Sequence, residues 1–360
     1  MSWLAEGVRR LSPAYFALVM ATGIVSLASM RAGFRLIAVA LLWLNVAQYV
    51  ILVVLFAVRA AQYTRAFTAD LRDHRAAPGF LTAVAGTCVL GNQFILIVGW
   101  SGVAQGLWVA GMLLWIILTY VIFTNLTIKE HKPSIQDGIT GGWLLAVVAS
   151  QAIAVLSALL SRQFEQPDRL YVNFLALSMW LWGGMMYIWM ISLIFYRYTF
   201  FPFSPGDLSP PYWINMGAMA ISTLAGSLLV ENADDAWFLR SLLPFLKGFT
   251  VFFWATGTWW IPMLAILAVW RHWWKRFPLT YDPLYWGAVF PLGMYAVATF
   301  QMARSMNLDF LLPVPRVFVF VALMAWAATF WGMIRHMLVT ARRDGRSPTA
   351  GIAASQEGHA

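Results

Sequence analysis

The stretch WGAVFPLGMYAVATF, residues 286–300, is apolar enough to cross a membrane, yet Pro291 and Gly293 stand near its centre. Proline inside a helix removes one backbone hydrogen bond and clashes with the preceding turn. A bulky Phe290 comes directly before the proline. On these residues alone, the commonest explanation is a kink that packs against neighbouring helices. The stretch therefore raises the question of why a membrane helix is interrupted at its centre.

The rest of the chain has the composition of an integral membrane protein. Of its 360 residues, 61% are hydrophobic and 11% are charged, whereas a soluble domain has about 25% charged residues. The single cysteine, Cys88, permits no intrachain disulfide. The net charge of +9 does not require a nucleic-acid partner, because membrane proteins accumulate Lys and Arg on their cytoplasmic side.

A spanning helix needs about 20 mostly apolar residues, and the sequence predicts ten such spans. Strands are not expected, because the runs show no period-two alternation. The first run follows Arg9 and Arg10 but is too long for a signal peptide. We expect one ten-helix transmembrane domain over residues 1–340 and a disordered cytoplasmic tail over 341–360. The predicted spans are 11–30, 36–58, 79–99, 104–125, 141–160, 171–196, 211–230, 241–270, 283–303 and 314–338.

The distribution of basic residues predicts the orientation of these spans. One set of loops and ends carries more than twice as many Lys and Arg residues as the other. The positive-inside rule then places both termini in the cytoplasm. We expect the protein to lie in the cytoplasmic (inner) membrane.

The odd-numbered spans begin alike, which suggests a repeated helical hairpin. Four of the five start at a proline, three of them with Ser or Asp before it, which is typical of a helix start; the span from Gly141 has no such proline. The starts are Ser12-Pro13, Ala77-Pro78, Ser209-Pro210-Pro211 and Asp282-Pro283.

Tryptophan gathers on the even-numbered spans. Because large indoles suit lipid-facing positions, we expect an inner ring of odd helices and an outer ring of even helices. Trp259 and Trp260 should then point outward. Chance combined with subunit contacts is the alternative explanation.

The residues expected to face the inner axis are small and neutral. Small residues also let helices approach closely, which is the alternative role for each of them. The candidate pore-lining residues are Thr22, Gly23, Gly86, Thr87, Ser150, Gly217, Ser222 and Met294, with Gly91, Thr223, Gly226 and Gly293 as further small positions.

The predicted spans contain no acidic residue, with Glu231 at a boundary, and the histidines lie in loops, at helix ends or in the tail. Proton-coupled carriers place such residues in the membrane as relays, so their absence disfavours a proton-driven pump and a metalloenzyme, and neither a metal nor a cofactor is expected. Lys247 is a cation within a predicted span, where a function is one explanation. Its place near a helix end favours the alternative, snorkelling. Five odd helices would direct their partially positive N-termini at one mouth, which favours anions there.

Three stretches together resemble the tellurite-resistance/dicarboxylate transporter family, which also contains plant slow-type anion channels and fungal malate and sulfite transporters. The resemblance implies five hairpins, odd helices around a central pore, and a homotrimer with one pore per subunit. It also implies that Phe290 closes the pore as a gate, aimed at the axis by a bend at Pro291 and Gly293. The stretches are PAYFALVMATGIVS (13–26), FFWATGTWWIPMLAILAVWRH (252–272) and PLYWGAVFPLGMYAVAT (283–299).

The leading hypothesis is a gated anion channel or channel-like exporter. Its partners would be the bilayer and small anions: chloride or nitrate, sulfite, or a C4-dicarboxylate such as malate. A dianion would normally require a fixed basic site, and the predicted inner ring shows none, which favours monovalent anions.

The alternative is an ion-gradient-coupled transporter for C4-dicarboxylates or tellurite-related oxyanions. A membrane enzyme is disfavoured, because no catalytic cluster is present. The sequence leaves the physiological anion and the gating stimulus open.

Overall fold

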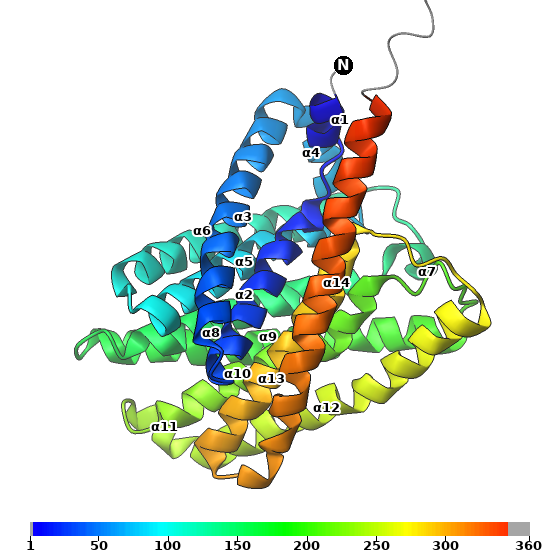
Figure 1. Cartoon of the computed structure of the whole chain (residues 1–360). Coiled ribbons are helices and arrows are strands. Elements are labelled where there is room, and N and C mark those ends of the chain that lie inside the picture. Colours follow the sequence, from blue (N-terminus) through cyan, green and yellow to red (C-terminus); the bar gives the residue numbers. More distant parts are fainter. Residues whose placement is uncertain (1–2, 345–360) are drawn as a thin grey trace, which may run out of the picture.

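The computed structural model describes residues 3–344, and this part of the chain contains helices and turns but no strand (Figure 1). The prediction of an all-helical membrane protein is confirmed. Five helices of moderate length are each followed along the chain by a longer one. The shorter five are α2 (Ala17–Arg31), α5 (Leu81–Gln93), α8 (Leu145–Ser161), α10 (Ile214–Glu231) and α13 (Trp286–Met306). The longer five are α3 (Arg35–Gln62), α6 (Ser101–Ile128), α9 (Asp168–Phe200), α12 (Leu243–Val269) and α14 (Pro313–Asp344).

Short elements precede or connect these ten helices. Four are α-helical: α1 (Trp3–Arg9), α4 (Thr64–Leu71), α7 (Ile135–Gly138) and α11 (Trp237–Ser241). Two π-helical turns extend α5 and α12, namely η3 (Phe94–Val98) and η6 (Trp270–Trp274), and the 3-10 turn η8 (Asp309–Leu311) precedes α14. α1 and the carboxyl end of α14 lie at the same end of the molecule (Figure 1).

Nine helical segments of the described chain are long and apolar enough to cross a membrane. α13 is long enough but is not among them, because Pro291, its glycines, Gln301 and Arg304 make it less apolar. The count of ten spans therefore stays a prediction. α14 is helical up to Asp344, which includes the first residues of the expected tail; residues 345–360 lie outside the described part.

All five shorter helices begin with a 3-10 turn. These turns are η1 (Pro13–Phe16), η2 (Ala77–Phe80), η4 (Gly141–Leu144), η5 (Pro210–Trp213) and η7 (Pro283–Tyr285). Ser12 and Asp282 accept hydrogen bonds from the backbone at two of these starts. Thr140 caps the span from Gly141 in the same way, so the span that lacks the proline signal shares the structure of the others.

The five shorter helices form a closed inner ring. α2 packs on α5, α5 on α8, α8 on α10, α10 on α13, and α13 returns to α2. Each longer helix packs on the inner helix that precedes it and also contacts the following one. In the apolar segments that contain α2, α5, α8 and α10, the buried share is between 72% and 94%. In the segments that contain the longer helices, it is between 11% and 50%. The longer helices therefore form an outer ring.

A belt of hydrogen bonds ties each outer helix to the next inner helix. Indole Nε1 donates to a hydroxyl oxygen from Trp115 to Ser150, from Trp254 to Thr299 and from Trp326 to Thr22, each at 3.0 Å. Trp180 on α9 donates to the carbonyl oxygen of Ser222 on α10. The hydroxyls of Tyr49 on α3 and Thr87 on α5 complete the belt. Since α14 reaches back to α2, the belt closes the ring.

This belt corrects the expectation that tryptophans of the even spans face lipid. Trp259 is 55% exposed, as predicted, but the prediction for Trp260 is wrong, because this side chain is buried and donates to the Tyr187 hydroxyl. An indole N–H in an apolar medium loses free energy unless it finds an acceptor. The inner ring supplies acceptors for the indoles of the belt, and Tyr187 on the outer helix α9 supplies the acceptor for Trp260.

Three outer helices end in buried arginines at the end of the molecule where the inner helices begin. Arg59, Arg197 and Arg271 each donate to a backbone carbonyl of a neighbouring segment. Their guanidinium groups lie over the rings of Phe67, Phe203 and Phe277, respectively. A cation at a helix C-terminus offsets the partial negative charge there, so these arginines fasten the outer ring to the connecting loops.

Candidate functional site

A cavity of about 360 Å³ lies at the amino ends of the inner helices. Its lining comes from the starts of all five, including Ala14, Gly79, Gly142, Pro211 and Leu284. We call it the N-terminal vestibule. The inner helices direct their unpaired backbone N–H groups and their partial positive charges toward this space.

The charged side chains of the N-terminal vestibule are two arginines, Arg75 and Arg197, and two aspartates, Asp73 and Asp207. Arg197 is buried; its Nη2 donates to Asp207 Oδ1 at 3.1 Å and its Nε to the carbonyl oxygen of Gln136 at 2.8 Å. Burial alone would raise the pKa of Asp207, but hydrogen bonds from Ser204 and the nearby Arg197 guanidinium outweigh it and lower the pKa. The side chains therefore add no formal net charge, and the positive potential must come from the helix ends.

A narrow cavity of about 20 Å³ adjoins this vestibule. Ala14, Leu145, Pro211 and Leu284 line both spaces. All five inner helical segments contribute to the narrow cavity, and Phe290 on α13 is part of its wall. The Phe290 side chain is 1% exposed. We call this narrow cavity the constriction.

The backbone around Phe290 is closely packed. A Cβ atom on Gly217 of α10 would lie 2.7 Å from Pro291 Cγ, and one on Gly293 would lie 2.9 Å from Ile24 of α2. Both glycines therefore let neighbouring inner helices approach α13 on either side of the proline. Because Pro291 has no N–H, the carbonyl oxygen of Gly287 lacks its usual helical donor, and Gly287 lines the constriction. α13 is helical throughout, and the bend stays a prediction.

A third cavity, of about 250 Å³, lies at the carboxyl ends of the same helices. We call it the C-terminal vestibule. Arg31, Arg162 and Arg304 line it together with a single carboxylate, Glu231. Glu231 accepts a hydrogen bond from Gln301 and lies 3.8 Å from Arg162 Nη2. Basic side chains thus outnumber acidic ones at the end where the helix C-termini carry partial negative charge.

The structure turns three of the four polar pore-lining candidates toward the outer ring. The hydroxyls of Thr22 and Ser150 accept from Trp326 and Trp115, Thr87 bonds to Tyr49, and the hydroxyl of Ser222 returns to its own helix at Ala218. The cause is the hydrogen-bonding belt, whose donors need acceptors in the membrane. These contacts give the hydroxyls of Thr22, Thr87 and Ser150 a role in helix packing, and their place in a pore lining stays a prediction.

The remaining candidates are also packed. Gly23 faces Val89 and Asn45, Gly86 faces Val19, and Gly217 faces Pro291. Met294 is buried. Lining of an axis by the eight candidate residues stays a prediction, and none of them lines the constriction or either vestibule.

Sequence reasoning missed the residues that surround these spaces. Arg31, Arg162 and Arg304 entered it only as counts for orientation, and Ala14, Thr82 and Leu145 carried no signal. One signal in the sequence could have found these residues. If five similar helices form a ring, their first turns surround one mouth of the ring and their last turns surround the other. Lys247 is exposed on α12 and lines none of the three cavities, as snorkelling predicts. No group of three or more potential metal ligands occurs among the described residues.

The fold and the three cavities are those of an integral membrane transporter or channel, and comparison with known proteins specifies the class. The family model described as "Voltage-dependent anion channel" matches residues 10–334. The chain belongs to this family, in agreement with the resemblance stated above. It is therefore an anion transporter or channel.

Individual relatives are named as a membrane protein, a transporter and an efflux pump. An uncharacterized membrane protein of Mycobacterium tuberculosis is 39% identical over 175 residues, which are 49% of this chain and 88% of that protein. An uncharacterized transporter of Methanocaldococcus jannaschii is 27% identical and covers 81% of this chain and 83% of its own length. A sulfite efflux pump of Arthroderma benhamiae is 22% identical and covers 91% of this chain and 90% of its own.

Proposed function

We propose that the chain is a passive, gated pathway for small anions along the axis of its inner ring. The observation that carries this proposal is the lining of the cavities. Both vestibules and the constriction draw side chains from all five inner helices. A space that all members of a closed ring border lies on its axis, so the three cavities mark the two mouths and the narrowest part of one route.

Phe290 is the gate in this proposal. Its side chain stands in the wall of the constriction, where about 20 Å³ is open, roughly the space of one water molecule. An aromatic ring in a narrow apolar passage blocks ions by volume and by preventing continuous hydration. Met20, Ile214 and Leu284 around it are apolar, which supports dewetting when the ring is in place.

The proposed substrates are small inorganic anions such as chloride, nitrate and sulfite. The constriction offers no charged side chain, and an ion that binds weakly can also leave. Sulfite is included because of the relative named as a sulfite efflux pump, and because part of it carries a single charge as hydrogen sulfite at neutral pH. A C4-dicarboxylate such as malate would have to pass the constriction without a fixed basic partner.

The proposed setting is the cytoplasmic membrane, with the N-terminal vestibule facing the cytoplasm. The positive-inside rule supports this orientation, and α1 and the carboxyl end of α14 lie at that same end (Figure 1). A homotrimer with one pathway per subunit is proposed from the family resemblance.

Flux measurements in proteoliposomes test the proposal. Under a potassium chloride gradient, the reversal potential should approach the chloride equilibrium value, and chloride, nitrate and sulfite should permeate better than malate. Imposing a pH gradient at fixed voltage should leave the chloride and nitrate fluxes unchanged. A reversal potential near the potassium value would contradict an anion pathway. Malate or tellurite uptake driven only by a proton gradient would favour the coupled transporter instead.

A further inference from the structure

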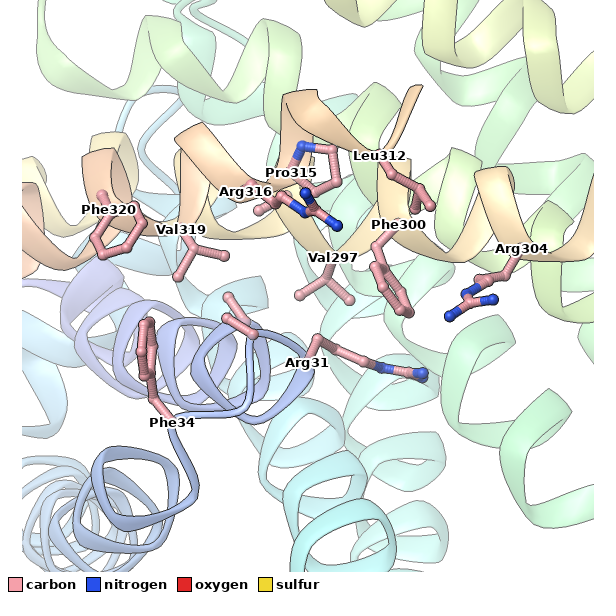
Figure 2. A pocket seen from close by; sticks show the side chains of 13 residues that line it. Arg31, Phe34, Val297, Phe300, Arg304, Leu312, Pro315, Arg316, Val319 and Phe320 are labelled. Carbon is pink, nitrogen blue, oxygen red and sulfur yellow. The ribbon is translucent and has the colours of Figure 1, made fainter. Parts of the chain in front are cut away.

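A fourth cavity opens on the side of the bundle where the last helical pair meets the first. It measures about 410 Å³ and lies between the end of α2, the second half of α13 and the start of α14. Figure 2 shows its lining. We call it the lateral groove. Ala28, Ala32 and Ala296 border it, and such small side chains leave the space between the helices open.

The two ends of the lateral groove differ in chemistry. Phe34, Val319 and Phe320 lie at one end, and the Arg31 and Arg304 side chains lie at the other, on the side of Phe300 (Figure 2). Phe320 is 54% exposed, so the apolar end is continuous with the surface that would face lipid. The groove is therefore amphipathic along its length.

Three arginines line the lateral groove: Arg31, Arg304 and Arg316. Two of them lie over the same ring, with Cζ of Arg31 at 5.4 Å and Cζ of Arg304 at 5.6 Å from the Phe300 centroid. Among the described residues, none of the three has a carboxylate oxygen within 4.0 Å. Glu231 pairs with Arg162 in the C-terminal vestibule, and Asp309, though near in sequence, is exposed and lines none of the groove.

The position of Arg316 in its helix is less favourable for an unpaired cation than the positions of Arg31 and Arg304. Arg31 and Arg304 occupy the last turns of α2 and α13, where a cation is favoured by the helix dipole. Arg316 occupies the first turn of α14, which has no acidic residue, and there the dipole disfavours a cation. An anion placed among the three guanidinium groups would remove this repulsion.

We propose that the lateral groove binds an anionic phospholipid. Its phosphodiester would lie among Arg31, Arg304 and Arg316, and an acyl chain would cover Phe34, Val319 and Phe320. Guanidinium groups match phosphate oxygens in geometry as well as charge. The three arginines stand at the ends of membrane helices, which is the depth of lipid headgroups.

The amphipathic shape favours a lipid over a soluble phosphate, which would leave the aromatic end uncovered. The charge favours an anionic headgroup, because the ammonium group of a zwitterionic lipid would be repelled by three arginines. Arg31 and Arg304 also line the C-terminal vestibule. A bound phosphate therefore lowers the positive charge at that mouth.

Binding can be measured on the purified, delipidated full chain without any anion gradient, so its outcome is independent of transport. The probes are phosphatidylglycerol and phosphatidylcholine of the same chain length, added in detergent. Native mass spectrometry gives occupancy, and thermal unfolding gives stabilisation. Phosphatidylglycerol should bind at least about tenfold more tightly, since a hydrogen bond to a charged group is worth a factor of about ten or more.

Two variants and a control connect this binding to the groove. Arg316→Gln should weaken phosphatidylglycerol binding about tenfold. Ala32→Trp places an indole from an exposed position into the groove and should reduce binding by exclusion. Arg240→Gln removes an arginine that is 76% exposed and lines no part of the groove, and it should bind as the parent does.

Three results would overturn the proposal. The first is equal binding of the two lipids, or full binding by both groove variants. The second is that inorganic phosphate or glycerol phosphate stabilises the protein as much as phosphatidylglycerol does. The groove would then bind phosphate only. The third is a change of oligomeric state in Ala32→Trp with no change in lipid binding, which would show that a second copy of the chain covers the groove.

Discussion

The two vestibules of the inner ring both offer positive charge to an anion, but the source of that charge differs between them. The N-terminal vestibule balances Arg75 and Arg197 against Asp73 and Asp207, and its positive potential comes from five helix starts. The C-terminal vestibule faces the opposite helix ends and sets Arg31, Arg162 and Arg304 against Glu231 alone. In a ring of parallel helices, dipoles attract anions at one mouth and repel them at the other. Side-chain charge is therefore needed where the dipoles oppose anions.

Reversing a charge at the C-terminal vestibule should have the largest effect. Arg304→Glu should lower anion flux about tenfold or more at low ionic strength, because charge in a mouth sets the local concentration of the permeant ion. Added salt should restore part of the flux. The assay belongs in phosphatidylcholine vesicles, which exclude an effect of anionic lipid.

The matched control for this experiment is Arg240→Glu, at an exposed arginine outside the vestibule. Equal losses in Arg304→Glu and Arg240→Glu would mean that surface charge in general, and not the vestibule, sets the flux.

At the N-terminal vestibule the main effect should be on stability. Arg197→Gln removes a buried guanidinium that bonds to Asp207 and to the Gln136 carbonyl. We expect a loss of about 2–3 kcal/mol in the free energy of unfolding, because removing one partner of a buried ion pair leaves the other charge without a partner. Thermal unfolding in detergent measures it. The double variant Arg197→Gln, Asp207→Asn should be more stable than Arg197→Gln. If the losses of stability of the two single variants add in the double variant, Arg197 and Asp207 do not stabilise the protein as a pair.

Between the mouths, a cut in the hydrogen-bonding belt should cost less. Ser150→Ala removes the acceptor of Trp115, and we expect a loss of about 1 kcal/mol. Anion permeability ratios should not change, because the hydroxyl faces α6. A changed ratio in a well-folded Ser150→Ala protein would return Ser150 to the pore lining that the sequence predicted.

The smallest effect should be a pH dependence at Asp207. Its pKa is lowered in the folded protein, so its contribution to stability is present above the unfolded pKa of about 3.9 and is lost as the pH falls through the folded value. The difference in melting temperature between parent and Asp207→Asn should be constant near neutral pH and shrink below about pH 4. A difference that grows on acidification would have the wrong sign.

The sequence predicted the ring better than it predicted the site. Hydropathy and the Pro starts at Pro13, Pro78 and Pro283 located the inner helices, because length in a bilayer and the chemistry of helix caps are local properties. The direction in which a hydroxyl points is not local. Thr22 faces Trp326, which is on the last helix of the described residues, and only closure of the ring brings them together.

The arginines illustrate the same limit. Arg31 and Arg304 come from the first and the last inner helix, and their sequence context gives no sign that they share a cavity with Arg162. The constriction is similar: Ala14, Leu145 and Gly287 are ordinary small residues that become a lining only when five helices meet. Phe290 was recognised because the Phe-Pro pair is unusual within an apolar helix and matches a known family pattern.

The central claim is that Phe290 closes the route between the two vestibules, and Phe290→Ala tests it most directly. The measurement is anion current per folded, membrane-inserted protein, with melting temperature recorded in parallel. If Phe290 is the gate, the variant folds and conducts far more anion than the parent, and Phe290→Leu lies between them. If Phe290 is only a packed core residue, truncation leaves a void that costs about 3–5 kcal/mol, and the current does not rise. Parent-like current in well-folded Phe290→Ala protein would contradict the account.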